Sequence, residues 1–175
     1  MKILIVVGHS KLKSRGYTSA SGVVNEYLWN KRFSKNLKAA LKKKGHTVSI
    51  LRCPSSKFTS ASQERTYKLD YLKNKHYDLI IELHCNASTN KLAKGCEALY
   101  ISTAGKAYAN MLLKGLSKDF VNRGVKKRTD LYMLTKTKDP TVMLESFFCT
   151  SEEDCAKAKG YKNRKRIARN IASAF

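Results

Sequence analysis

The sequence predicts an α/β fold of three layers, in which a mostly parallel, twisted sheet is flanked by helices on both faces. Three observations support this prediction: short unbroken apolar runs, apolar stripes at helical spacing between them, and short connections that make the two kinds of segment alternate. With 175 residues, 42% of them hydrophobic, the chain has enough apolar material for the core of one domain, which we assign to residues 1–175.

The first half of the chain alternates between strands and helices. The apolar run at residues 2–7 predicts a first strand, and 48–51 predicts a second. Between them, from about 22–24 to 44, apolar residues recur every three or four positions, which predicts an amphipathic helix. Residues 60–63 read Ser-Ala-Ser-Gln and resemble a capping box, so we expect a helix over 61–74.

A central strand begins at Leu79, where three consecutive apolar residues follow a charged loop. Such a run is typical of a strand that is covered on both faces. After it we expect further strands of the same sheet at Gly95–Ile101, Leu131–Leu134 and Thr141–Phe148. We expect helices between and after them at about 104–120, from 151, and at about 163–175. The alternation therefore continues to the last residues of the chain.

The charge of the chain indicates attraction to a polyanion. Its 35 basic and 13 acidic residues give a formal net charge of +22. A nucleic acid or a bacterial wall carrying anionic polymers would both suit this charge. No helix-turn-helix, RNA-binding sheet or zinc-finger pattern is present, so we expect no specific nucleic-acid partner.

Cysteine use and apolar runs indicate where the chain is made. Five cysteines without CxxC spacing fit reduced, mostly buried thiols. The run at Ile3–Val7 is too short for a signal peptide, and nothing approaches the roughly 18 apolar residues of a membrane helix. We expect a protein that does not span a membrane, is made in the cytoplasm, and reaches an outside target only after membrane permeabilisation.

Four residues form a candidate catalytic constellation: His9, His84, Glu26 and Glu145. The two histidines follow predicted strands, and Glu26 lies in the first turn of a predicted helix. Each has a simpler explanation, a core histidine or a carboxylate favoured by the helix dipole. Together, however, two histidines and a carboxylate are a standard catalytic zinc set that leaves one position for water. Glu145, inside an apolar run, would supply the base that such a hydrolase needs.

Six short blocks appear in a fixed order along the chain: Val7–Ser10, Val24–Glu26, Ile81–Ala87, Gly95–Glu97, Asn122–Gly124 and Val142–Glu145. They resemble the signature blocks of zinc-dependent N-acetylmuramoyl-L-alanine amidases. Within that family the chain is similar, over essentially all its residues, to the catalytic domains of clostridial phage endolysins.

The resemblance implies a fold, a cofactor and a reaction. One zinc ion would be held by His9, Glu26 and His84, with Glu145 as the catalytic glutamate. The substrate would be the peptidoglycan of the bacterial wall, and the enzyme would cleave the amide between the lactyl group of muramic acid and the L-alanine of the stem peptide. Relatives of the endolysin type often continue into a wall-binding domain, and we expect no separate one within residues 1–175. Either such a domain has been trimmed away, or the basic surface itself contacts anionic wall polymers. We expect a monomer.

Two further residues are candidates for substrate binding. Asn86 either hydrogen-bonds substrate or braces the loop after the central strand. Arg123 either contacts a carboxylate or phosphate or is a structural arginine at the surface. Two other functions stay open: a zinc peptidase that cuts within the stem peptide with the same chemistry, and a basic module that binds wall or nucleic acid without a metal.

Overall fold

The computed structural model describes residues 1–175 and contains one six-stranded sheet. The strand order across the sheet is β2-β1-β3-β6-β4-β5. The strands are β1 Lys2–Val7, β2 Thr47–Leu51, β3 Leu79–Asn86, β4 Cys96–Tyr100, β5 Asn122–Lys127 and β6 Thr141–Phe148. Strands β2, β1, β3 and β6 are parallel, β4 pairs antiparallel with β6, and β5 is parallel to β4.

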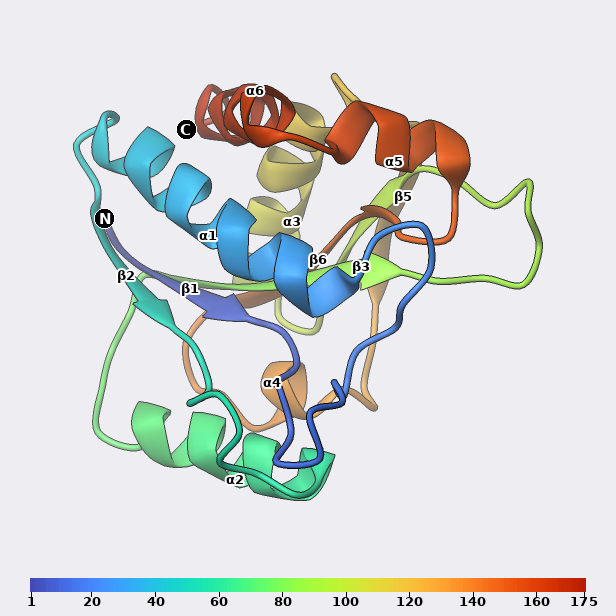
Figure 1. Cartoon of the computed structure of the whole chain (residues 1–175). Coiled ribbons are helices and arrows are strands. Elements are labelled where there is room, and N and C mark those ends of the chain that lie inside the picture. The colour runs from blue at the N-terminus through green and yellow to red at the C-terminus, as the bar shows by residue number, and fades with distance from the viewer.

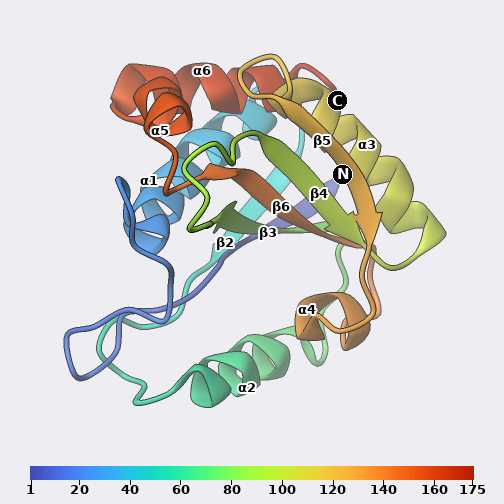
Figure 2. The same ribbon diagram turned by 90° about the vertical axis from the view of Figure 1, so that its right-hand side faces the viewer.

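Helices cover both faces of this sheet (Figures 1 and 2). Helices α1, α3, α5 and α6 lie on one face, and α2 and α4 lie on the other. Their bounds are α1 Glu26–Lys42, α2 Ala61–Leu72, α3 Thr103–Leu116, α4 Tyr132–Thr135, α5 Glu152–Ala158 and α6 Tyr161–Ala172. The predicted three-layer fold with a mostly parallel sheet is confirmed.

The alternation of side chains along β3 decides which face carries its polar residues. Leu79, Ile81 and Leu83 belong to the large core beneath α1, α3 and α6. Ile80 packs in the smaller core against residues of α2 and α4. Because successive side chains of a strand point to opposite faces, His84 lies on the α2 side of the sheet.

Three sequence predictions differ from the structure. Residues 131–134 were expected to form a strand, but Tyr132–Thr135 form the short helix α4; a four-residue apolar run suits either state. The edge strand β5 was not predicted because Asn122–Lys127 has mostly exposed residues and no apolar run. The first long helix begins at Glu26 and not at 22–24, because the side chain of Asn25 caps it by accepting a hydrogen bond from the Leu28 N–H at 3.0 Å.

Other predictions agree with the structure. All five cysteines are free and buried, as expected for reduced thiols. Ser60 caps α2 by accepting a hydrogen bond from the N–H of Gln63. None of the helices has the length and apolar character that crossing a membrane requires.

Candidate metal centre

His9 and His84 approach each other at the carboxyl ends of β1 and β3. His9 lies two residues after the end of β1 and has a positive φ of 64°, a conformation uncommon outside glycine. Gly8 makes the approach possible: a Cβ at this position would meet the Leu83 carbonyl oxygen and, at 2.7 Å, the His84 ring. The ring centroids of the two histidines are 4.7 Å apart.

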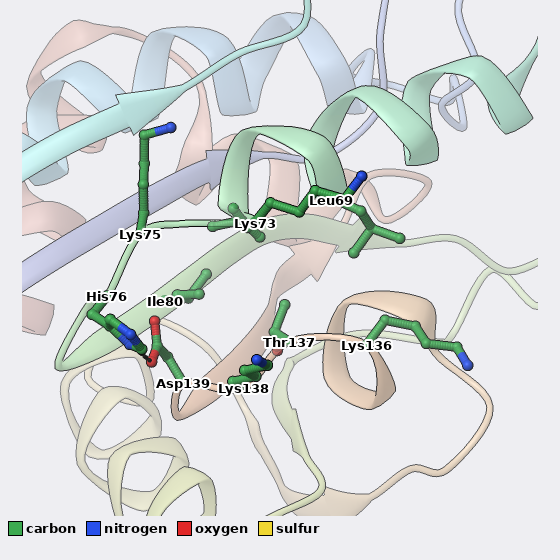
Figure 3. Close-up of a pocket in the computed structure, with 10 residues that line it drawn as sticks. Leu69, Lys73, Lys75, His76, Ile80, Lys136, Thr137, Lys138 and Asp139 are labelled. Atoms are coloured by element: carbon green, nitrogen blue, oxygen red, sulfur yellow. Dashed lines mark hydrogen bonds and ion pairs between the residues drawn. The ribbon is translucent and has the colours of Figure 1, made fainter.

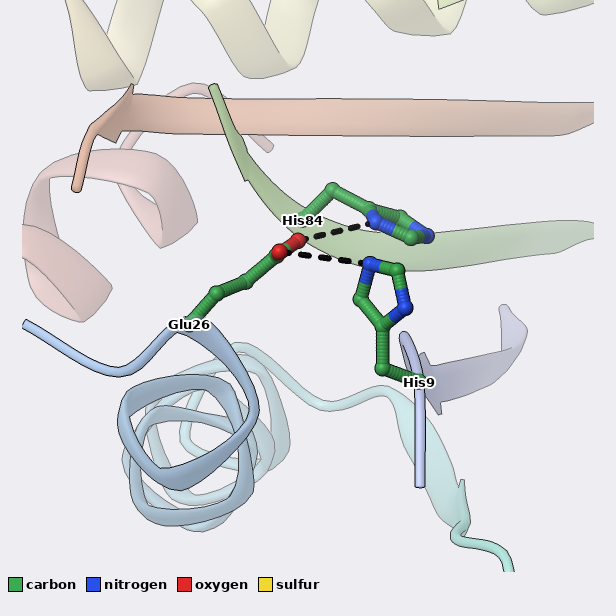
Figure 4. A group of neighbouring side chains, drawn as sticks. All are labelled: His9, Glu26 and His84. Atoms are coloured by element: carbon green, nitrogen blue, oxygen red, sulfur yellow. Dashed lines mark hydrogen bonds and ion pairs between the residues drawn. The ribbon is translucent and has the colours of Figure 1, made fainter. Parts of the chain in front are cut away.

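Glu26 comes to the same point from the helix side. It is the first residue of α1 and is almost completely buried. Its Oε1 lies 3.0 Å from His84 Nδ1, and its Oε2 lies 3.2 Å from His9 Nε2 (Figure 4). Each of the three residues therefore offers one possible metal-binding atom, a ring nitrogen or a carboxylate oxygen, and these atoms lie within 4.8 Å of one another.

Backbone amides fix the orientation of the Glu26 carboxylate. The N–H of Cys85 donates to Oε1 at 2.9 Å, and the N–H of Ala20 donates to Oε2 at 3.2 Å. Burial alone would raise the pKa of Glu26, but hydrogen bonds to His84 and His9 outweigh it and hold that pKa well below its usual value. The carboxylate is therefore ionised and aimed at both imidazoles.

These residues fit a zinc ion by their chemistry. Two imidazole nitrogens and one carboxylate are the donor set of catalytic zinc sites that keep a fourth position open. Both histidines also line a cavity of about 410 Å³, which gives a ligand access to the point where the three side chains meet.

Glu145 lines the same cavity from β6. It is the register partner of His84 across the β3–β6 pair, so both side chains lie on one face. Its Oε2 is buried and makes no hydrogen bond within the protein. Burial raises its pKa to about 7; the charge of His84 opposes this rise, and that of Glu26 adds to it. Glu145 is thus a carboxyl group able to gain and lose a proton near neutral pH.

The two candidate substrate residues lie outside this cavity. Asn86 ends β3, its side-chain nitrogen is buried, and its side chain is close enough to Glu97 to help lower the pKa of that carboxyl. Arg123 donates to Glu97 at 3.4 Å, and its guanidinium lies 5.0 Å from the ring centre of Phe148. Arg123 thus has contacts within the protein that suit a structural arginine. The substrate-binding roles of Asn86 and Arg123 stay predictions.

The sequence prediction did not include the cavity wall opposite the sheet. This wall comes from α2, which contributes Glu64, Arg65 and Lys68, and from α4, which contributes Tyr132. Glu64 and Lys68 are four residues apart and so share one face of their helix. That spacing was visible in the sequence, but it is also typical of an exposed ion pair.

A second cavity, of about 310 Å³, lies on the α2 face beside the start of β3 (Figure 3). Four lysines line it, but their side chains do not gather on one point (Figure 3). Lys75 donates to the Tyr71 carbonyl oxygen at 2.7 Å, and Lys73 pairs with Asp70 at 3.2 Å. This cavity has no set of residues comparable to His9, Glu26 and His84.

Comparison with known proteins identifies the family. Residues 3–175 match the family described as N-acetylmuramoyl-L-alanine amidase. The chain belongs to this family. The membership predicted from the six sequence blocks is confirmed, and it makes the chain an amidase.

Individual proteins and solved structures are also similar to this chain. The catalytic domain of the CD27L endolysin, described as targeting Clostridia Difficile, is 44% identical with a TM-score of 0.93, and the match covers 99% of this chain and 96% of that one. An uncharacterised protein of Clostridium perfringens is 30% identical over 160 residues, which are 88% of this chain but only 45% of that protein. The catalytic domain of CwlV, an amidase from Bacillus (Paenibacillus) polymyxa var. colistinus, shares the fold at 22% identity, a TM-score of 0.78 and coverage of 99% and 96%.

Proposed function

We propose that the protein is a zinc-dependent hydrolase of peptidoglycan that cleaves the amide between the lactyl group of muramic acid and L-alanine. The observation that carries this proposal is the convergence of His9, Glu26 and His84, with donor atoms within 4.8 Å of one another, beside a cavity that Glu145 also lines. Family membership supplies the bond to be cleaved.

Zinc would be held by His9, Glu26 and His84, and when bound it supplies Lewis acidity that polarises the amide carbonyl and acidifies water. Glu145 does the proton chemistry. Its unpartnered Oε2 accepts a proton from the attacking water and returns it to the departing nitrogen of L-alanine. The backbone amides of Ala20 and Cys85 keep Glu26 in place throughout.

Digestion of purified bacterial walls tests the proposed bond. Mass spectrometry of the products is expected to find intact stem peptides that begin at L-alanine, together with glycan chains free of peptide. Fragments cut inside the stem peptide would contradict the proposal and favour the zinc peptidase. Walls left undigested by zinc-loaded protein would favour the binding module without a metal.

We further propose an endolysin-like role, in which the protein is made in a host cytoplasm and reaches the wall after membrane permeabilisation. The similarity to an endolysin catalytic domain supports this proposal, and the formal charge of +22 supports contact with anionic wall polymers. Expression in an intact bacterium is expected to be tolerated, with lysis after a membrane-permeabilising agent is added. Lysis without that agent would contradict the proposed delivery.

A further inference from the structure

The imidazole nitrogens that point away from Glu26 each lie near a second carboxylate, directly for His84 and through a threonine hydroxyl for His9. His84 Nε2 lies 3.5 Å from Glu82 Oε2, an oxygen with no other partner. His9 Nδ1 lies 3.3 Å from the Thr18 hydroxyl, which donates to Glu64 Oε2 at 2.8 Å. Carboxylates in this position commonly fix the tautomer and ring orientation of a metal-binding histidine.

One lysine joins the two carboxylates. Lys68 Nζ donates to Glu64 Oε1 at 2.9 Å and to Glu82 Oε1 at 3.1 Å. Lys68 is 1% exposed, Glu64 5% and Glu82 0%. Burial alone would lower the pKa of Lys68, but the charges of Glu82 and Glu64 outweigh it and raise that pKa, so the lysine is an ammonium.

The directions of these contacts matter. In each carboxylate Oε1 accepts from Lys68, which leaves Oε2 turned toward a histidine or toward the hydroxyl that contacts one. Lys68 and Glu64 belong to α2 and Glu82 belongs to β3. The Lys68 ammonium therefore holds one carboxylate of the helix and one of the strand at the same time. A structural ion pair would need only one carboxylate, whereas holding two histidines requires both.

We propose that Lys68 is a positioning residue of the metal centre, which orients His84 through Glu82 and His9 through Glu64 and Thr18. This inference rests on the proposed function, because it assumes that the two histidines bind zinc. Without Lys68 the two carboxylates repel each other and are free to turn away from the imidazoles. Zinc affinity then falls because the rings are no longer held in place.

The test is the zinc dissociation constant of Lys68→Met, measured in competition with a chromophoric chelator. We expect zinc to bind about 10- to 100-fold more weakly, the usual effect of losing such outer partners. Lys73→Met is the matched control: Lys73 follows the same helix but is exposed and pairs only with Asp70. It is expected to bind zinc like the wild type.

A double-mutant cycle with Thr18→Val separates positioning from general stability. If Lys68 acts on His9 through Glu64 and Thr18, the loss of zinc affinity in Thr18→Val/Lys68→Met is smaller than the product of the two single losses. A purely structural Lys68 would lower the melting temperature of the metal-free protein and leave zinc affinity unchanged. Unchanged or tighter zinc binding by folded Lys68→Met overturns the inference, as do fully independent losses in the cycle.

If Lys68→Met does not fold, Lys68→Met/Glu82→Gln is compared with Glu82→Gln, since the double variant removes one buried charge of each sign. The double variant is expected to bind zinc more weakly than Glu82→Gln, because Glu64 is then no longer held toward Thr18 and His9; equal affinities would overturn the inference. Zinc binding by the wild type separates a failure of the proposed metal centre from a failure of the proposed role of Lys68. A wild-type protein that binds no zinc overturns the proposed metal centre and this inference with it, whereas wild-type binding with unaltered variants overturns the inference alone.

Discussion

Replacing Glu145 with glutamine tests both the environment and the role of this residue. In the metal-free fold, burial raises the pKa of Glu145 from 4.5 to about 7. A carboxyl group whose pKa is higher in the folded than in the unfolded protein lowers the stability of the fold as pH rises from the unfolded-state pKa through the folded-state pKa, because the buried group must then ionise. At about 1.4 kcal/mol for each pKa unit, the loss above pH 7 is about 3 kcal/mol. Glutamine keeps the shape of the side chain and has no acidic proton to lose.

Chemical denaturation of the metal-free wild type and of Glu145→Gln measures this difference. We expect similar free energies of unfolding near pH 4 and a variant that is about 3 kcal/mol more stable at pH 8. If the free energies of unfolding of the two proteins changed with pH in the same way, the pKa of Glu145 would not be raised in the folded protein, which would refute this prediction.

The zinc-loaded Glu145→Gln protein tests the catalytic role. General acid–base catalysis typically contributes about 100- to 10,000-fold, so wall hydrolysis is expected to fall by that order while zinc content stays at the wild-type level. If Glu145 were instead a fourth metal ligand, zinc would be lost together with activity. A variant that still hydrolyses wall at the wild-type rate would end the assignment.

Three further predictions concern the metal and the surface. His84→Ala is expected to lose zinc and hydrolysis together, which elemental analysis and a wall-turbidity assay would show; retained zinc would contradict the ligand role. Gly8→Ala is expected to weaken zinc binding because its methyl group would meet the His84 ring at 2.7 Å, whereas Gly16→Ala, whose nearest contact would be 3.6 Å, should bind zinc normally in the same titration. Sedimentation with purified walls is expected to show binding that weakens as salt rises, since exposed charges are screened within about 10 Å at 0.1 M; binding insensitive to salt would argue against the electrostatic contribution of the +22 charge.

The apolar runs made most of the sheet predictable, and the exceptions have physical reasons. Strands β1, β3 and β6 are buried on both faces, so each contains an unbroken apolar run. The edge strand β5 is not covered in this way and has the polar sequence Asn-Arg-Gly-Val-Lys-Lys. The direction of β4 was not predictable either, because side chains alternate in the same way in parallel and antiparallel strands.

The candidate site was predictable where a single residue broke a local pattern. The histidines at strand ends and Glu145 within an apolar run are of this kind. Glu82 likewise stands between apolar residues of β3, and its partner in the structure is Lys68. That Lys68 is buried and shared with Glu64 depends on how α2 packs against β3, which no local pattern encodes.

His9, Glu26 and His84 are expected to hold one zinc ion. This can be tested with diffraction data from crystals of the zinc-loaded protein, collected just above and just below the zinc absorption edge. We expect one strong anomalous difference peak, present only above the edge, between His84 Nδ1, His9 Nε2 and the Glu26 carboxylate. A zinc-loaded crystal whose only such peak lies away from these three side chains would contradict it.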